Sequence, residues 1–151
     1  MKKLIVLLLS STLATMAYAT NDLQANVKEP ICTSSAPNPI GTYSQAIKVG
    51  KTVHISGQIP IDPATGKLVE GDFEAQARRV FKNLSAITQA AGGNLDNIAK
   101  LNVYLTDLND FATLNALMGK YFTKPYPARV VVGAKDLLKN ATIEIDAVMQ
   151  K

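Results

Sequence analysis

The stretch YPARVVVGAKD, residues 126–136, places a single arginine at the head of a run of valines that otherwise has the composition of a buried strand. Arginine is rarely buried without a partner, so either Arg129 lies at a strand end in water or a negatively charged group meets it there. A planar guanidinium binds a carboxylate through two parallel hydrogen bonds and keeps its charge at any physiological pH. Arg129 is therefore the first candidate for a residue that binds an acidic ligand.

Glu144 is the acidic residue that the spacing offers to Arg129. If the last two strands form a hairpin that turns near Leu137 and Leu138, Arg129 and Glu144 are diagonal neighbours, about 7 to 8 Å apart at the backbone. Spacing alone favours a cross-strand ion pair, worth about 0 to 1 kcal/mol where exposed. The alternative is a site in which the arginine binds a ligand and the carboxylate acts on it.

Other reactive side chains are few. One histidine, His54, and one cysteine, Cys32, cannot build a metal site of the usual His/Cys composition within one chain. The stretch GTYSQAIKVGK has neither the P-loop spacing nor the dinucleotide-binding spacing. His54 and Ser56 lie two residues apart without a nucleophile elbow, which favours a packed or exposed histidine over a catalytic triad. We expect no metal and no cofactor, and the remaining candidates are Arg129, Glu144, Tyr43 and the backbone around Ser56 and Gly57.

The first 19 residues carry the three parts of a secretory signal peptide. MKK is positively charged, LIVLLLSSTLA is largely apolar, and AYA at 17–19 is a small-x-small cleavage signal. The uncharged stretch 4–19 is short for a bilayer span, which needs about 20 apolar residues. We predict cleavage after Ala19, export to the periplasm or the medium, and no stable membrane insertion afterwards. An uncleaved membrane anchor is the alternative.

The net charge and the cysteine count limit which partners and covalent links the sequence supports. Cleavage would remove two of the 16 basic residues and none of the 12 acidic ones, which leaves 14 against 12 and a formal net charge of +2. A net charge this small does not indicate binding to a nucleic acid. Since Cys32 is the single cysteine, the exported protein would not depend on an intramolecular disulfide.

Residues 20–39 are polar, contain three prolines and show no sustained period, so we predict an N-terminal extension there and one folded domain over 40–151. Alternation in AIKVGKTVHISGQIPI predicts two strands joined by a two-residue loop at Gly50 and Lys51. Helical periodicity follows Asp72 and again Asp110. The stretches IAKLNVYLT, ARVVVGA and ATIEIDAVM alternate and predict three further strands.

The order β-β-α-β-α-β-β predicts an α+β fold with a single mixed sheet and two helices packed on one face. Two helices cover only that face of the sheet. The simplest way to cover the opposite face is to pack another copy of the chain against it. The predicted open face is polar and carries Thr52, His54, Ser56, Asn102, Tyr104, Glu144 and Asp146. We therefore expect a subunit interface that encloses polar clefts.

Several separate stretches resemble the Rid/YjgF family of reactive-intermediate deaminases. They are GTYSQAIKVGKTVHISGQIPIDPATGKLV, AQARRVFKNLSAITQAAGGNLDNIAKLNVYLTDLNDFATLNALMGKYF, YPARVVV and IEIDAVM, and the similarity runs from about 36 to 149. The most telling pieces are SGQIP at 56–60 and PAR at 127–129. The resemblance implies a chorismate mutase-like fold, assembled as a barrel-like homotrimer with helices outside and three clefts between subunits.

The resemblance also implies an activity, the hydrolysis of 2-imino or enamino acids to 2-keto acids and ammonia without a cofactor. By similarity, Arg129 would hold the substrate carboxylate, and Glu144 would position or activate the attacking water. A carboxylate near an arginine keeps a low pKa, so we expect Glu144 to be a weak base that mainly orients water. The substrate-binding residues implied by the family are Tyr43, Ser56, Gly57, Asn115 and Arg129.

Two positions and the leader depart from the family pattern. Thr42 stands where proline is usual, and Val131 stands where many deaminase members carry a cysteine. The leader would separate this protein from the cytoplasmic dehydratases that generate such imines. A non-catalytic trimeric protein that binds carboxylates or acts like a chaperone is therefore the alternative function. RNA cleavage, sometimes attached to this family, fits poorly with export and a charge near +2.

Overall fold

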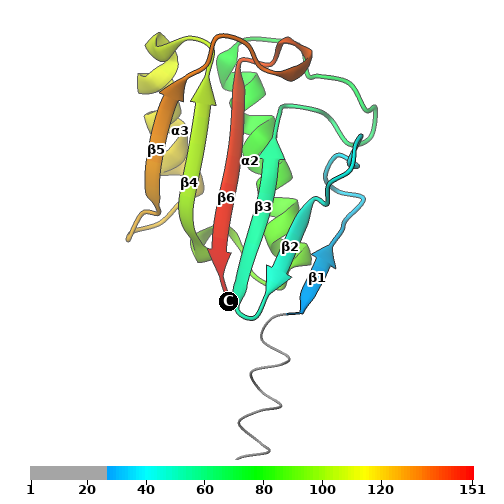
Figure 1. Ribbon diagram of the computed structural model, residues 1–151. Coiled ribbons are helices and arrows are strands. Elements are labelled where there is room, and N and C mark those ends of the chain that lie inside the picture. The colour runs from blue at the N-terminus through cyan, green and yellow to red at the C-terminus, as the bar shows by residue number, and fades with distance from the viewer. Residues whose placement is uncertain (1–26) are drawn as a thin grey trace, which may run out of the picture.

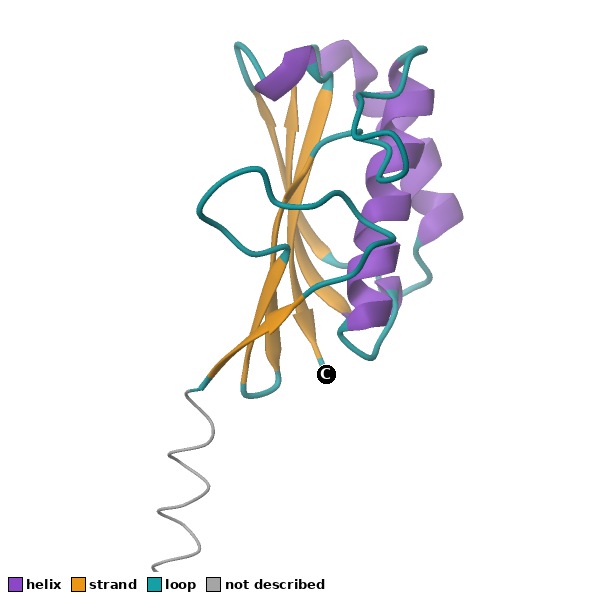
Figure 2. Cartoon of the chain, turned by 90° about the vertical axis from the view of Figure 1, so that its right-hand side faces the viewer, coloured by secondary structure: helices purple, strands orange, loops and turns teal. Residues whose placement is uncertain are grey.

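The computed structural model describes residues 27–151, so the predicted signal peptide and the start of the predicted extension lie outside the described residues. The described chain forms one six-stranded sheet in the order β1-β2-β3-β6-β4-β5. Helices α2 and α3 lie behind the sheet in Figure 1 and on one side of it in Figure 2. The elements are β1 (Lys28–Ile31), β2 (Ala46–Val49), β3 (Thr52–Gln58), α2 (Phe73–Ala90), β4 (Ile98–Leu105), α3 (Phe111–Tyr121), β5 (Ala128–Gly133) and β6 (Ile143–Gln150).

The predicted α+β class, with a single mixed sheet and two helices on one face, is confirmed. Every strand pair is antiparallel except β4 with β5, which run parallel. The predicted two-residue loop at Gly50 and Lys51 is confirmed as well, since Val49 pairs with Thr52. Gly50 has φ 58°, a left-handed conformation that glycine adopts without the cost a side chain would add.

The predicted hairpin of the last two strands is wrong. Strand β5 pairs with β4 alone, and β6 lies between β3 and β4. Helix α3 connects β4 to β5, and a helical crossover of this kind returns the chain parallel to the strand it left. Arg129 therefore pairs with Leu101 of β4, and the expected diagonal contact with Glu144 does not form.

The sheet also begins earlier than the predicted domain start at residue 40. Strand β1 pairs antiparallel with β2, and Lys48 Nζ lies 2.9 Å from Glu29 Oε2 across this pair. Pro30 is tolerated because β1 is an edge strand. Part of the predicted extension is thus a strand of the sheet.

The core lies between the helices and the sheet. Asp72 caps α2 by accepting a hydrogen bond from Ala75 N at 2.9 Å. Val80, Leu84 and Ile87 of α2 are fully buried. They belong to the same hydrophobic cluster as the inward-facing residues of the central strands, Leu101, Val103, Leu105, Ile143, Ile145 and Met149.

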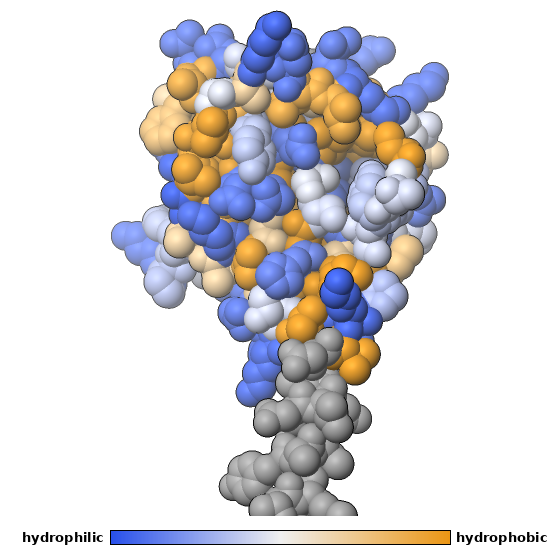
Figure 3. Space-filling view, viewed as in Figure 1, coloured by the Kyte–Doolittle hydropathy of each residue, from blue (hydrophilic) through white to orange (hydrophobic). Residues whose placement is uncertain are grey.

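The opposite face of the sheet is the polar face that the alternation predicted. Tyr104 stands opposite Glu144, Asn102 opposite Asp146, and His54 opposite Val148. Hydrophilic and hydrophobic residues are intermixed on this face (Figure 3). No described helix covers it, and the outward-facing Val130 and Val132 of β5 are 42% and 45% exposed.

Candidate active site

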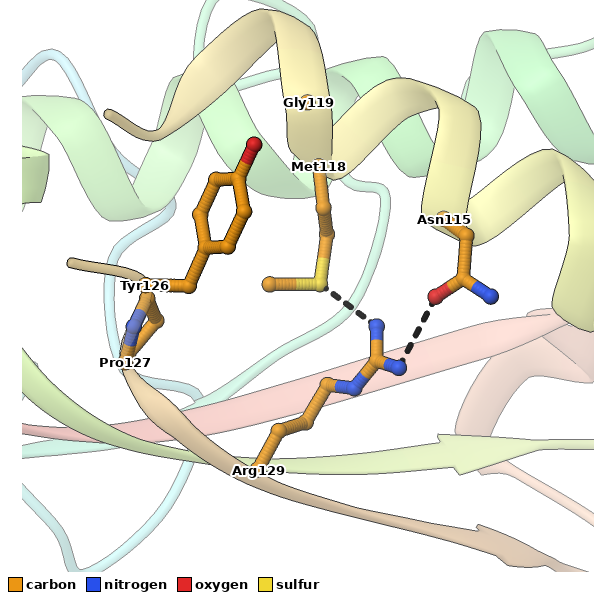
Figure 4. Close-up of a pocket in the computed structure, with 6 residues that line it drawn as sticks. All are labelled: Asn115, Met118, Gly119, Tyr126, Pro127 and Arg129. Carbon is orange, nitrogen blue, oxygen red and sulfur yellow. Dashed lines mark hydrogen bonds between the residues drawn. The ribbon is translucent and has the colours of Figure 1, made fainter. Parts of the chain in front are cut away.

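The predicted site residues other than Ser56 fall into two groups, each beside its own pocket. The first pocket, which we call the arginine half-site, has a volume of about 420 Å³. It is lined by Asn115, Met118, Gly119, Tyr126, Pro127 and Arg129 (Figure 4). Helix α3 supplies one wall, and the entry to β5 supplies the other.

The pairing of β5 determines where Arg129 points. Because Arg129 stands opposite the buried Leu101, its side chain emerges on the helix face, beneath α3. Its Nη2 donates to Asn115 Oδ1 and its Nη1 to Met118 Sδ, both at 2.8 Å. Its Cζ lies 5.3 Å from the centroid of the Phe111 ring, within the range of a cation–π contact.

Arg129 meets no carboxylate among the residues that the structure describes. The ion pair with Glu144 that spacing favoured is therefore wrong. Partial burial lowers the pKa of Arg129 from its ordinary value, but a guanidinium remains charged at physiological pH. The arginine half-site thus presents a fixed positive charge. The guanidinium N–H groups not bonded to Asn115 or Met118 can donate to an anionic ligand.

The second pocket, which we call the carboxylate half-site, is smaller, at about 60 Å³. Tyr43, Gly57 and Glu144 line it, together with the exposed side chains of Ile40 and Leu138. Glu144 is half-buried, and it belongs to the open face of β6. Gly57 on β3 lies so close that a Cβ built on it would overlap Glu144 Oε1.

Ser56, which the family resemblance placed among the substrate-binding residues, lies on β3. The register between β3 and β6 shifts between Ile55 and Gln58, so Ser56 lies in an irregular segment. Its Oγ donates to Ser44 O at 2.7 Å and its N to Gln45 O at 3.0 Å. It lines neither half-site of the single chain, in which it holds the neighbouring loop, and its part in substrate binding stays a prediction.

Gln45 is a site-supporting residue that the sequence reasoning missed. It is only 2% exposed, and its Oε1 accepts from Thr33 N at 2.7 Å. Its Nε2 lies within hydrogen-bond distance of Thr33 O, Ala36 O and Pro37 O, at 2.9, 3.2 and 2.9 Å. The one sign of this role in the sequence is that a polar residue directly precedes strand β2. Gln45 therefore fixes the start of the loop that carries Tyr43.

The electrostatics of Glu144 also differ from the expectation. The pKa of Glu144 is raised above its ordinary value, first by burial and then by the negative charge of Asp146. The expected lowering by Arg129 is absent because Arg129 lies on the other face of the sheet. Glu144 is therefore a stronger base than the sequence reasoning suggested.

A single chain does not bring the two half-sites together. Arg129 is on the helix face opposite Leu101, whereas Glu144 is on the open face opposite Tyr104. Strand β4 lies between their strands, and the two positions differ by about 10 Å along β4 and about 10 Å across the sheet. The structure thus brings Arg129 together with Asn115, and Glu144 together with Tyr43 and Gly57.

Two further observations concern the described residues alone. Over 27–151, no group of three or more His, Cys, Asp or Glu side chains could hold a metal ion. In the same part of the chain, no helix is long and apolar enough to cross a membrane.

Known proteins are similar to this chain in both sequence and fold. A RutC family protein of Pyrococcus abyssi is 50% identical over 124 residues, which cover 82% of this chain and 98% of the relative. The human 2-iminobutanoate/2-iminopropanoate deaminase is 43% identical over 122 residues, covering 81% of this chain and 89% of that protein. The crystal structure of RidA from the Antarctic bacterium Psychrobacter is 50% identical, with a TM-score of 0.79, and covers 82% of this chain and 99% of the RidA chain.

The element order, the single mixed sheet and the two helices on one face define an α+β protein with the architecture of the solved Rid structures. A family model described as Endoribonuclease L-PSP matches residues 33–150. The chain belongs to the Rid/YjgF family, which confirms the resemblance found in the sequence.

Proposed function

We propose that this protein hydrolyses reactive 2-imino or enamino acids to 2-keto acids and ammonia, in clefts formed between the subunits of a homotrimer. The observation that carries the proposal is Arg129, a positioned guanidinium without a carboxylate partner in the described chain. The name of the human relative, 2-iminobutanoate/2-iminopropanoate deaminase, supports the reaction class.

The chemistry needs one anchor and one base. Arg129 binds the substrate carboxylate through two parallel N–H donors, and Asn115 and Phe111 keep the guanidinium in place. A protonated imine is already electrophilic at C2, so water attacks there, and its proton passes to Glu144. Transfer of that proton to the amino group makes ammonia the leaving group. As the C2–N bond breaks, the C2 hydroxyl becomes the keto oxygen, and its proton passes to Glu144 and then to the released ammonia, which leaves the 2-keto acid and ammonium.

The trimer is part of the proposal because a single chain holds two halves of a site. In a rotationally symmetric trimer, one subunit's arginine half-site can face the next subunit's carboxylate half-site. The uncovered sheet face and the exposed Val130 and Val132 are consistent with such an assembly. Export through residues 1–19 remains our prediction for the compartment in which the protein works.

The test generates a 2-imino acid in situ with an amino-acid oxidase and follows release of the 2-keto acid. We expect wild-type protein to accelerate release over buffer and Arg129→Ala to abolish the acceleration. Arg129→Lys, which keeps the charge and loses the planar fork, should retain only part of it. Absence of acceleration by the wild type would contradict the proposal. In that case, calorimetry that detects Arg129-dependent binding of 2-keto acids would instead support a non-catalytic carboxylate-binding or chaperone-like protein.

A further inference from the structure

A polar cluster next to Glu144 on the open sheet face has no part in the reaction described so far. Asp146 lies two residues after Glu144 on β6, so both side chains emerge on the same face, about 7 Å apart along the strand. Asn102 Nδ2 donates to Asp146 Oδ1 at 2.7 Å, and the Tyr104 hydroxyl donates to Asp146 Oδ2 at 3.2 Å. Both carboxylate oxygens are thus fixed by residues of β4.

Tyr104 links the two carboxylates. It stands directly opposite Glu144 across the β4–β6 pair while its hydroxyl reaches Asp146. The charge of Asp146, followed by burial, raises the pKa of Tyr104, so this phenol stays neutral and keeps donating its proton. The cluster therefore holds the negative charge of Asp146 in one place instead of neutralising it.

The other titratable groups near Glu144 come from other strands and loops than β6. Tyr43 shares the carboxylate half-site, and Lys139 lines a neighbouring pocket that has Ile40 as a common wall. His54 and Lys100 both stand opposite Val148, further along the same face than Asp146. Arg129 of the same chain lies on the other face. In the proposed trimer the neighbouring subunit's Arg129 would face Glu144, and this charge is the same in the wild type and in a variant at 146.

We propose that Asp146 is a positioning residue, whose fixed negative charge makes Glu144 a stronger base toward the attacking water. This inference rests on the proposed function, because it assigns the base strength that the hydrolysis uses. The raised pKa of Glu144, due first to burial and then to Asp146, agrees with it. A general base transfers protons best when its pKa lies near the working pH.

Asp146→Asn is the informative variant because it removes the charge and keeps the shape. Its amide oxygen can accept from Asn102, and its amide nitrogen can donate to the Tyr104 oxygen. Glu144 must be ionised to accept a proton, so activity rises as pH passes upward through its pKa. Loss of the neighbouring charge lowers that pKa. We expect the acid limb of the kcat/KM profile to move to lower pH by about half a unit to one and a half units, with a reduced plateau.

Two controls separate the charge from a structural role. Tyr104→Phe removes one hydrogen bond to Asp146 but leaves the charge, so the acid limb should stay in place. Asp136→Asn removes a charge from an exposed loop residue and should not move the limb either. If Asp146→Asn does not fold, Asp146→Thr removes the charge with a residue that suits a strand. A folded variant that lacks the charge at 146 and shows an unshifted acid limb would overturn the inference.

A second readout does not depend on activity. NMR titration of protein labelled at the glutamate side-chain carboxyls reports the pKa of Glu144 directly, in the wild type and in Asp146→Asn. A lower Glu144 pKa in the variant supports the inference even if the wild type hydrolyses no imine, a result that would overturn the proposed function alone. An active wild type with the same Glu144 pKa in both proteins would overturn this inference and leave the proposed function standing.

Discussion

Glu144 owes its position to the absence of a side chain on the neighbouring strand. A Cβ built on Gly57 would overlap Glu144 Oε1 and approach its Cδ to 3.0 Å. Gly57 does not have a positive φ, so backbone conformation is not the reason for a glycine at this position. The reason is space, since the carboxylate lies directly against the bare Cα.

At the residue scale we therefore predict that Gly57→Ala displaces the Glu144 carboxylate. A misplacement of about 1 Å can cost about 100-fold in rate, so we expect kcat/KM for imine hydrolysis to fall by about 10- to 100-fold. Overpacking should also reduce the free energy of unfolding by about 1 to 3 kcal/mol. The oxidase-coupled assay and chemical denaturation measure the two effects.

Gly133→Ala is the matched control for this prediction. Its Cβ would meet Leu108 at 3.4 Å, an ordinary contact, and Gly133 lines neither half-site. We expect kcat/KM to stay within about twofold of the wild type there. A folded Gly57→Ala protein with wild-type kcat/KM would show that Glu144 needs no such fixed position.

The candidate catalytic residues could be predicted from the sequence, but the side chains that they contact could not. Arg129 and Glu144 stand out by type, because a charged residue in an apolar strand needs a reason. Their partners depend on which strands pair, and nothing in the local sequence shows that Arg129 meets Asn115 and Met118 on α3. Gln45 was missed for the same reason, since its bonding partners are backbone groups that lie 8 to 12 residues away along the chain.

At the scale of elements, the loop between β1 and β2 depends on one buried amide. Gln45 bonds to both backbone groups of Thr33 and to the carbonyls of Ala36 and Pro37. Its own backbone carbonyl accepts from Ser56 N, which ties the loop to β3 beside Gly57. The side chain of Gln45 thus holds the loop wall of the carboxylate half-site, and its backbone carbonyl ties that wall to β3.

We predict that Gln45→Ala loosens this loop. Removing the side chain leaves partly buried backbone groups without partners, so the free energy of unfolding should fall by about 1 to 3 kcal/mol. Proteolysis between 33 and 43 should become faster, because local opening becomes easier. Chemical denaturation and limited proteolysis with mapping of the first cut measure the two effects.

Gln89→Ala provides the comparison for Gln45→Ala. Gln89 is exposed on α2, and its side chain makes a long contact of 3.4 Å with Ser85. Its replacement should change the free energy of unfolding by no more than about 0.5 kcal/mol. Equal stability losses in the two variants, or an unchanged first cut in Gln45→Ala, would argue against the loop-fixing role.

The helices and the β2–β3 hairpin were predicted well, whereas strand β1 and the pairing of β5 were not. The helical periodicity predicted after Asp72 matched α2, Phe73–Ala90. Strand β1, KEPI, was missed because it contains Pro30, and proline within a short segment argues against a strand unless the strand lies at a sheet edge. The mistaken last hairpin followed from placing a turn near Leu137 and Leu138, whereas the crossover through α3 determines that β5 joins β4.

For the whole molecule, the sheet itself separates the groups that the proposed reaction needs. Arg129 projects beneath α3 from the edge strand β5, and Glu144 projects from the open face of β6. Their separation across β4 exceeds the reach of one small substrate. If the protein is the imine hydrolase that we propose, each working site must combine residues from two subunits.

The last prediction tests this by mixing two inactive proteins. Arg129→Ala subunits keep Glu144, and Glu144→Gln subunits keep Arg129, so neither forms a working site alone. In a cyclic trimer that contains both types, one of the three interfaces joins an intact arginine half-site to an intact carboxylate half-site. Random co-assembly from an equal mixture should therefore restore about a quarter of the wild-type activity. Co-refolded mixtures and the oxidase-coupled assay measure the recovery, with separately refolded and then pooled variants as the control. A mixture that co-assembles, as shown by differently tagged subunits purifying together, but stays inactive would place both groups of each site in one chain and contradict the composite cleft.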